Sequence, residues 1–479
     1  MRTVAYGHRR WSQALYPTRI CMASGASAPA SDDVVSAFDA SGVPLRVVTA
    51  ASLFDGHDAA INVMRRLIQA AGCEVIHLGH DRSALDVVKA AIEEDAHAVA
   101  LTSYQGGHME YFTYIRELLN AAGREDIRIF GGGGGTITPP EIRDLHAAGI
   151  TRIYSPDDGR QMGLLGMIDN LVQQASECNI LAQDMDLNSP VTPAQREKVA
   201  RLISLAENAD PVTFAQSLKA CRSRPMETRV PVIGFTGTGG AGKSSLLDEL
   251  MRRITTQNPQ LNVALLCTDP TRKRTGGALL GDRIRMNTLT SDRLFMRSLA
   301  SRSSGKELSE KTREAIEVCQ ATGYDLIFVE TSGIGQGSDG ITDVSDVSLY
   351  VMTSEFGAHT QLEKIEMLDV ADLVVLNKFE KLGAEDALRA IRKQVKRNRN
   401  LFEMEDSALP VIPTIASQFS DPGVDLLWER LAAILSDRHD MILAAREPQL
   451  PESGMPEPQH IIPPERIHYL ADISRTVRG

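Results

Sequence analysis

The most specific chemical signal in the sequence is a glycine-rich loop that ends in a lysine and a serine. The run GTGGAGKS at 237–244 follows an apolar stretch and opens a helical pattern. In this setting G-x-x-x-x-G-K-S binds nucleotide phosphates, because glycines let backbone N–H groups approach the oxygens and the helix N-terminus adds positive charge. We expect Lys243 to reach the β- and γ-phosphates and the Ser244 hydroxyl to bind Mg²⁺. The loop residues predicted to bind nucleotide are Gly237, Gly239, Gly240, Ala241, Gly242, Lys243, Ser244 and Ser245.

A base-reading motif is expected after a later strand of the same domain, and NKFE at 377–380 follows an apolar stretch there. It is close to the guanine motif N-K-x-D, in which a carboxylate accepts hydrogen bonds from the base. Glu380 keeps the charge of that aspartate and adds a methylene group, so the motif favours guanine. A surface loop is the alternative interpretation of this run taken alone. The residues predicted to contact the γ-phosphate or the base are Gly333, Asn377, Lys378, Glu380 and Ser417.

A second constellation lies near the N-terminus, where Asp55 and His57 are two residues apart after an apolar stretch. The pattern resembles the D-x-H-x-x-G of domains that bind cobalamin with the cofactor's own base displaced. Neutral imidazole is a good cobalt ligand, and a carboxylate on its second ring nitrogen fixes the tautomer and raises basicity. The residues predicted to bind this cofactor are Asp55, His57, Ser103, Gly132 and Gly133, with His57 on cobalt.

Ser103 and the glycine run at 131–135 support the same interpretation, because each follows a later apolar stretch. The carboxyl ends of parallel strands are where ligands bind in such sheets. Two positions depart from the resemblance, since Ala60 stands where glycine is usual and Gln105 where leucine is usual. The alternative is a flavodoxin-like domain that binds no corrin.

In two successive regions of the chain, short apolar runs alternate with helical patterns, and these elements must position the residues named above. Continuous apolar runs are typical of buried parallel strands, so we predict an α/β protein with a flavodoxin-like doubly wound domain followed by a P-loop GTPase domain. Strands are expected at 45–50, 73–79, 97–103, 127–130 and 151–155, and then at 230–235, 262–267, 325–330, 347–352, 372–377 and 409–414.

The predicted organisation is a leader at 1–44, a first α/β domain at 45–177, a helical connector at 178–228, a second α/β domain at 229–443 and a linker at 444–479. The leader is rich in arginine and poor in acidic residues. A mitochondrial transit peptide, a disordered leader and a docking helix all fit that composition.

Composition narrows the class of protein. The 479 residues carry a net charge of −11, which argues against a fold-wide surface for nucleic acid. No apolar run approaches the ~18 residues of a membrane-spanning helix. The six cysteines form no C-x-x-C pair, so a disulfide framework is not expected and a cytoplasmic location fits.

The stretch around TDP at 268–270, TGG at 275–277 and GDRIRM at 281–286 resembles the G-protein chaperones of cobalamin-dependent acyl-CoA mutases, the MeaB/ArgK type. The resemblance implies that Asp269 and Asp282 belong to the Mg²⁺ and switch network. It also implies that Glu330 holds or orients a metal-bound water. The residues taken as catalytic are Lys243, Asp269, Asp282 and Glu330, and those taken as magnesium-binding are Ser244, Asp269, Asp282 and Glu330. Gln361 and Lys364 resemble the mobile switch segment of that family.

A cobalamin domain followed by this GTPase and a linker is similar to the front part of the fused isobutyryl-CoA mutase family. The resemblance implies adenosylcobalamin, GTP, GDP and Mg²⁺ as cofactors. It also implies a GTPase that gates cofactor loading and protection, and conversion of isobutyryl-CoA to n-butyryl-CoA in the complete enzyme. A substrate-binding (β/α)₈ barrel needs about 250 residues, and only about 35 follow residue 443. We therefore expect a truncated chain or one piece of a split enzyme.

The expected partner is the mutase barrel, in cis or as a separate chain, and a homo-oligomer is also expected, without nucleic acid or membrane. A freestanding cobalamin carrier or sensor, whose GTPase switch acts on another partner, is the alternative. A nickel or hydrogenase maturation GTPase would carry His/Cys clusters, which the sequence does not show.

Overall fold

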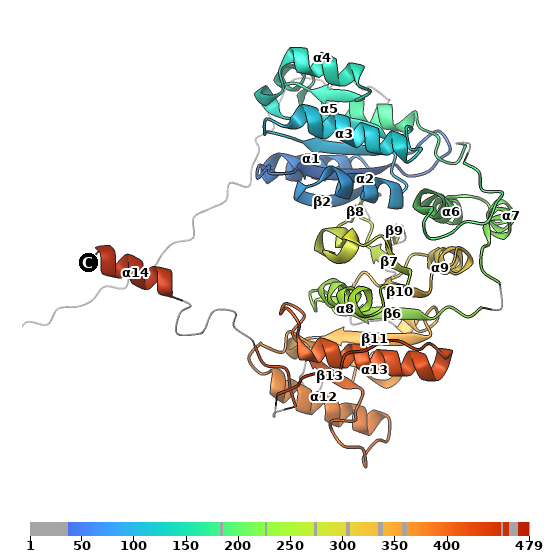
Figure 1. Ribbon diagram of the computed structural model, residues 1–479, viewed down its shortest axis with the longest axis vertical. Helices are drawn as coiled ribbons and strands as arrows, with labels where there is room; N and C mark the ends of the chain where they lie inside the picture. The colour runs from blue at the N-terminus through green and yellow to red at the C-terminus, as the bar shows by residue number, and fades with distance from the viewer. Residues whose placement is uncertain are drawn as a thin grey trace, which may run out of the picture. The chain divides into compact units, whose positions relative to one another are not determined.

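The computed structural model describes residues 37–478, apart from 183–184, 226–227, 273–274, 303–306, 334–338, 357–361, 452–453 and 459–467. Two parallel sheets organise this part of the chain (Figure 1). In the first sheet the strand order is β5-β4-β3-β1-β2-β8, and in the second it is β13-β12-β11-β6-β10-β7-β9. The sheets confirm the predicted α/β class.

The first sheet is built mainly from buried valine, isoleucine and alanine runs, as parallel strands covered on both faces require. Its strands are β1 (Arg46–Ser52), β2 (Glu74–Arg82), β3 (Ala98–Thr102), β4 (Arg128–Gly132), β5 (Arg152–Tyr154) and β8 (Ala278–Leu280). Its helices are α1 (Asp58–Ala70), α2 (Ala84–Glu93), α3 (His108–Ala121), α4 (Pro139–Ala147) and α5 (Pro156–Ser176), with a short 3₁₀ turn η1 (Gly134–Thr136). Helix α1 packs against α5, and α2 packs against α3.

Local sequence sets where several of these helices begin. Ser83 and Asp86 form a reciprocal capping box at the start of α2, and Ser155 and Asp158 form another at the start of α5. Such boxes satisfy backbone N–H groups that have no partner inside the helix. Helices α6 (Arg196–Asn208) and α7 (Pro211–Cys221) follow in the region between the two sheets.

The second sheet carries one apolar core on each face. Its strands are β6 (Val232–Gly237), β7 (Val263–Asp269), β9 (Leu294–Ala300), β10 (Leu326–Glu330), β11 (Val347–Met352), β12 (Leu373–Asn377) and β13 (Val411–Thr414). The helical segments are α8 (Lys243–Gln257), η2 (Asp282–Arg285), η3 (Thr288–Thr290), α9 (Thr312–Ala321), η4 (Asp339–Ile341), η5 (Ser354–Phe356), α11 (Met367–Val370), α12 (Ala384–Asn398) and α13 (Pro422–His439), and α14 (Tyr469–Arg478) lies near the end of the chain.

Two strands were not anticipated from the sequence. Strand β9 is fully buried although Arg297 and Ser298 interrupt its apolar run, and β8 has only three residues. Strand β8 belongs to the chain segment of the second domain, yet it pairs with β2 at the edge of the first sheet. This pairing joins the two parts of the molecule that carry the predicted sites.

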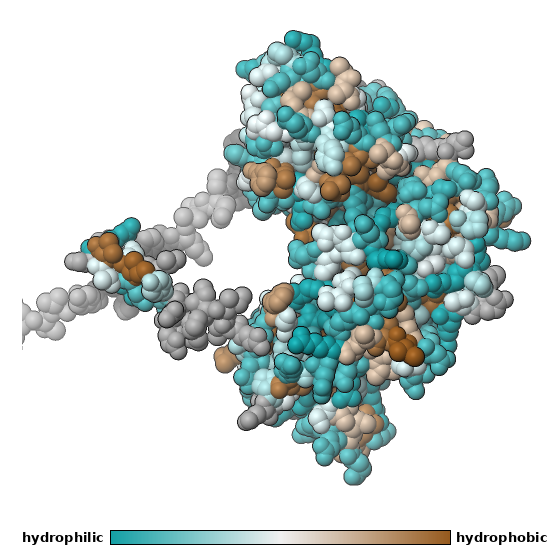
Figure 2. Space-filling view, viewed as in Figure 1, coloured by the Kyte–Doolittle hydropathy of each residue, from teal (hydrophilic) through white to brown (hydrophobic). Residues whose placement is uncertain are grey.

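The visible surface is mostly hydrophilic, and Figure 2 shows hydrophobic side chains only in small separate patches. Among the described residues, no helix is both long enough and apolar enough to cross a bilayer.

Candidate functional sites

The predicted phosphate loop connects β6 to α8, and its backbone adopts conformations that glycine favours. Gly237, Gly240 and Gly242 have φ angles of 145°, 77° and 90°, in the region that disfavours side chains. A Cβ atom on Gly237 would lie 2.0 Å from the Val351 carbonyl oxygen, so the loop also packs closely on β11. The neighbouring strand therefore fixes the shape of the loop.

Lys243 is the first residue of α8, and its ammonium group is directed at the loop. Nζ donates hydrogen bonds to the carbonyl oxygens of Gly237 at 3.1 Å and Thr238 at 3.4 Å. Burial lowers the pKa of Lys243. A Cβ atom on Gly333 would lie 2.3 Å from Nζ. The structure thus brings together Lys243 and Gly333, the two residues predicted to reach the γ-phosphate.

The residues predicted to bind magnesium meet in the same place. Ser244 Oγ donates to Glu330 Oε1 at 2.8 Å and lies 3.3 Å from Asp282 Oδ1. Asp269 Oδ2 accepts the Gly281 N–H at 2.9 Å. Burial and then the Asp282 carboxylate raise the pKa of Glu330 to about 8, and the same two causes raise the pKa of Asp269 to about 8. Crowded buried carboxylates of this kind fit a hard divalent cation, which binds oxygen ligands and relieves their repulsion.

These groups line one cavity of about 510 Å³, which opens beside the phosphate loop. Its volume and its mixture of backbone N–H groups, cations and carboxylates suit a nucleotide polyphosphate with its metal. The lining includes Gly239, Gly240, Gly242, Lys243, Ser244, Ser245, Asp269, Asp282, Arg285, Glu330 and Lys378.

Asn377 connects the phosphate loop to the predicted base-reading turn. Its Nδ2 donates to the Ala241 carbonyl at 2.8 Å, and its Oδ1 accepts the Ala416 N–H at 3.1 Å. Lys378 has a positive φ of 59° and donates through Nζ to the Gly240 carbonyl at 2.7 Å. The turn after β12, the turn after β13 and the phosphate loop are therefore held as one unit.

Glu380 and Ser417 lie in these two turns, and both are exposed. Their side chains are accessible to a base, as a recognition role requires. Of the predicted switch residues, Lys364 is also exposed, and Gln361 lies outside the described residues.

The second site lies at the carboxyl end of β1. The buried Asp55 carboxylate accepts the Tyr104 N–H at 2.6 Å and lies 2.8 Å from His57 Nδ1. Burial of Asp55 opposes ionisation, but the N–H groups of Tyr104 and His57 outweigh it and lower the pKa of Asp55. The His57 side chain is 71% exposed. Its Nδ1 is held by a carboxylate while the ring faces outward, which is the arrangement that a metal-ligating imidazole needs.

Ser103 contributes differently from Asp55 and His57. Its Oγ accepts a hydrogen bond from Ser52 Oγ at 2.9 Å, within the strand ends of β1 and β3. A Cβ atom on Gly133 would lie 1.9 Å from the Ser103 carbonyl oxygen, whereas the nearest atom to a Cβ on Gly132 is 3.4 Å away. Packing of the sheet therefore requires glycine at 133, whereas the protein's own packing leaves room for a Cβ atom at 132.

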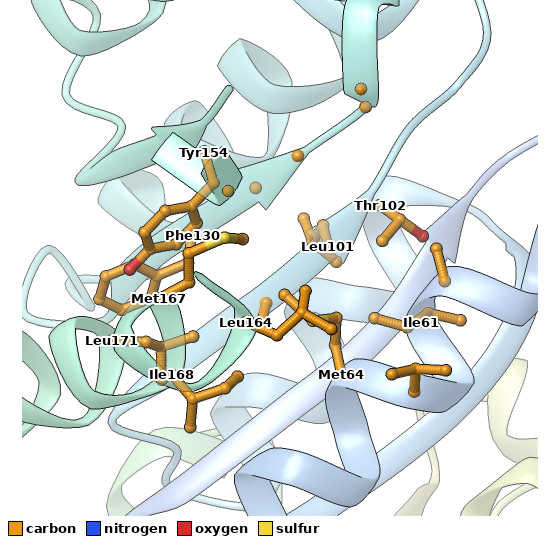
Figure 3. Close-up of a pocket in the computed structure, with 18 of the residues that line it drawn as sticks. Ile61, Met64, Leu101, Thr102, Phe130, Tyr154, Leu164, Met167, Ile168 and Leu171 are labelled. Atoms are coloured by element: carbon orange, nitrogen blue, oxygen red, sulfur yellow. The ribbon is translucent and has the colours of Figure 1, made fainter. Parts of the chain in front are cut away.

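An apolar cavity of about 430 Å³ lies beside the glycine run at 131–134. Figure 3 shows Phe130 and Tyr154 on one side of it and Ile61 and Met64, from α1, on the other. Bare backbone and apolar walls suit a flat heterocyclic group. The lining of the cavity therefore agrees with the cofactor site expected from the sequence.

Three residues near these sites were not assigned roles from the sequence. The Tyr104 ring centroid lies 5.3 Å from that of His57. Its position in the chain next to Ser103 could have indicated that it lies near the site. Cys267 places its Sγ within 4.8 Å of ligand atoms of Asp282 and Glu330. Arg283 follows Asp282 in a motif that was recognised without a role for its arginine.

Comparison with known proteins matches both halves of the chain. Residues 45–158 match the model of the B12 binding domain, and residues 199–444 match that of the methylmalonyl-CoA mutase-associated GTPase MeaB. The latter begins inside α6, so it includes most of the region predicted as a connector.

Curated relatives agree with these matches. The fused isobutyryl-CoA mutase of Geobacillus kaustophilus is 50% identical over 440 residues, which cover 91% of this chain and 40% of that protein. A putative GTPase of Pyrococcus horikoshii is 35% identical over 49% of this chain and 73% of its own length. The GTPase ArgK of Escherichia coli is 33% identical over 50% of this chain and 71% of its own length. The chain thus spans about two-fifths of the length of the fused relative.

Proposed function

This chain belongs to the MeaB family of GTPases and carries a B12-binding domain, and we propose that a guanine nucleotide in the second domain controls adenosylcobalamin in the first. The proposed control acts on loading and protection of the cofactor. The observation that carries it is the position of Asp282, a predicted magnesium ligand, two residues after the end of a strand that belongs to the cobalamin domain's sheet.

In the proposed reaction the GTPase hydrolyses GTP to GDP and phosphate. The phosphate loop and Lys243 position the phosphates for in-line attack by water and stabilise the negative charge that develops. Ser244, Asp269 and Asp282 would hold Mg²⁺, and Glu330 would hold or orient its water. When bound, Mg²⁺ neutralises charge on the β- and γ-phosphate oxygens. Glu380 would select guanine.

In the first domain His57 would bind cobalt, with Asp55 fixing the tautomer of its imidazole. The cavity beside Gly132 would take the displaced base. When bound, adenosylcobalamin supplies a carbon radical by homolysis of its cobalt–carbon bond. The fused relatives are named for isobutyryl-CoA mutase activity, so we propose that this chain serves the conversion of isobutyryl-CoA to n-butyryl-CoA together with a mutase barrel.

The proposed domain boundaries are those expected from the sequence, with a cobalamin domain at 45–177 and a GTPase domain at 229–443. We also propose a cytoplasmic location, which the free, buried state of Cys73, Cys178, Cys221, Cys267 and Cys319 supports. Homo-oligomerisation stays a prediction.

The link between the two sites has a backbone component. Strand β8 pairs in parallel with β2, with Ala278 opposite Glu74 and Leu280 opposite Ile76. The chain then passes through Gly281, whose N–H donates to Asp269, into η2. A movement of Asp282 would therefore displace β8, which forms the edge of the cobalamin domain's sheet.

The link also has an ionic component next to Asp282. Arg283 is buried, and its guanidinium donates to Glu93 at 2.7 Å and to Glu94 at 3.3 Å, both at the end of α2. Glu94 also forms an ion pair with Arg46 of β1, whose Nη1 lies 3.2 Å from Glu94 Oε2. Buried ion pairs hold a fixed geometry because breaking one leaves an uncompensated charge. Two consecutive residues thus link the sites, since Asp282 is a predicted magnesium ligand and Arg283 contacts the cobalamin domain.

A titration with adenosylcobalamin followed by absorbance tests the cofactor assignment. The wild-type chain should give the spectral change of base displacement, and His57→Ala should not. Phosphate release from GTP with Mg²⁺ tests the hydrolysis. Persistence of the spectral change in His57→Ala would contradict the ligand assignment, and absence of GTP hydrolysis would contradict the enzymatic one.

A further inference from the structure

The chain beyond α13 stays on the GTPase domain rather than leaving it. The Ala444 carbonyl accepts hydrogen bonds from Trp428 Nε1 at 3.1 Å and Asn258 Nδ2 at 2.9 Å. The Arg446 N–H donates to Gln257 Oε1 at 2.7 Å. This anchoring fixes where the following segment begins.

Residues 455–458, which we call the strap, then contact the turns that follow β12 and β13. Met455 is partly buried against the apolar core that includes Phe379 and Ala384. The Glu457 carbonyl accepts a hydrogen bond from Gln418 Nε2 at 3.2 Å. Together with residues 379–386 the strap encloses a cavity of about 400 Å³. The strap is therefore attached both to the turn after β12 and to the turn after β13.

Those are the two turns that carry the predicted base contacts. Glu380 lies in the first and lines the cavity beside the strap. Ser417 lies in the second, next to Gln418, and the Ala416 N–H of the same turn is bonded to Asn377. A base held by both turns requires a defined separation between them, and the strap is a second connection, besides Asn377, that can set it.

We infer that the strap is part of guanine recognition, with Met455 and Gln418 as positioning residues that hold the Glu380 and Ser417 turns at the spacing the guanine base requires. This inference rests on the proposed GTPase function. Linkage between sites is reciprocal, so a bound guanine base also restrains the strap.

Binding of GDP and of inorganic tripolyphosphate to the full chain separates base recognition from phosphate recognition. Gln418→Met removes the amide donor at similar volume, and Met455→Ser removes the apolar anchor. We expect the double variant to bind Mg²⁺-GDP about tenfold more weakly, because one hydrogen bond and one packing contact are lost. Its tripolyphosphate affinity should stay within about twofold of the wild-type value. Arg446→Ala is the matched control, since the Arg446 side chain is exposed in the same segment, and it should change neither affinity.

Unchanged GDP affinity in the double variant would overturn the inference, and so would an equal loss for both ligands, which reports damage to the phosphate loop. Wild-type protein that binds tripolyphosphate but not GDP would instead contradict the proposed GTPase function. Amide hydrogen exchange gives a second test. GDP should slow exchange within the strap and tripolyphosphate should not, whereas equal protection by both ligands would overturn the inference.

Discussion

The nucleotide site and the cobalamin site differ in how completely this chain builds them. At the nucleotide site Lys243, Ser244 and Glu330 are buried and hydrogen-bonded to one another or to the loop. At the cobalamin site Asp55 and Ser103 are buried, while the His57 ring is largely exposed. The first site is a cluster of buried charged groups beside the phosphate loop. The second site presents the imidazole predicted to bind cobalt on the surface, with the His57 side chain 71% exposed.

This difference predicts how a substitution in one site affects the geometry of the other site. Residues that are fixed by their own domain keep their geometry when the other site is altered. The segment made of β8 and η2 is the exception, because β8 pairs with β2 of the first sheet and η2 carries Asp282 of the nucleotide site. Variants in each site and in this segment can therefore break or sharpen the comparison.

Lys243→Ala should have the largest effect. Removal of the cation that faces the transferred phosphoryl group should lower the GTP hydrolysis rate about 1,000-fold. Adenosylcobalamin affinity, measured by absorbance titration, should stay within about twofold, because the cobalamin site does not use this residue. Loss of both activities would mean that the two sites do not fold independently.

Arg283→Met should have the next largest effect, on the stability of the junction. Glu93 and Glu94 would lose a buried partner, so we expect a decrease of about 3 kcal/mol in the free energy of unfolding in urea. Arg389→Met is the control, because its ion pairs with Glu385 and Asp386 are exposed and worth less than about 0.5 kcal/mol. Equal decreases in the free energy of unfolding for the two substitutions would show that the buried ion pairs of Arg283 stabilise the fold no more than exposed ones.

Asp55→Asn should weaken adenosylcobalamin binding by between about 10-fold and 100-fold, since the amide cannot stabilise the His57 tautomer as a carboxylate does. The rate of GTP hydrolysis should not change. An unchanged cobalamin affinity would indicate that His57 binds cobalt without help from Asp55, or not at all.

Gly132→Ala should have the smallest effect. A methyl group there meets no atom closer than 3.4 Å, so the free energy of unfolding should change by less than about 0.5 kcal/mol. Cobalamin affinity should fall about threefold as the methyl group enters the apolar cavity. Gly133→Ala should instead destabilise the fold, because its Cβ would overlap the Ser103 carbonyl. Similar stability losses for both variants would contradict this distinction.

Much of the fold followed from apolar runs, because buried parallel strands have little else in their sequence. The phosphate loop and the Asp55–His57 pair were also predictable, since each consists of residues adjacent in the chain. The cluster predicted to bind magnesium required the resemblance to MeaB, because Asp269, Asp282 and Glu330 come together only in the folded chain.

The junction could not be predicted. Strand β8 is too short for a pattern, and its partner β2 lies about 200 residues earlier in the chain. The buried Arg283 and Glu94 look like ordinary surface charges in the sequence, since such residues are buried only when paired. Tertiary contacts of this kind leave no local signal.

Cobalamin affinity measured in different nucleotide states tests most directly whether the nucleotide controls the cobalamin domain. Adenosylcobalamin should be titrated by absorbance into the wild-type chain with Mg²⁺-GDP, with a non-hydrolysable GTP analogue and Mg²⁺, and with no nucleotide. We predict dissociation constants that differ by at least about fivefold between the GDP and GTP-analogue states, as a coupling of about 1 kcal/mol requires. Identical affinities in all three states would contradict this control.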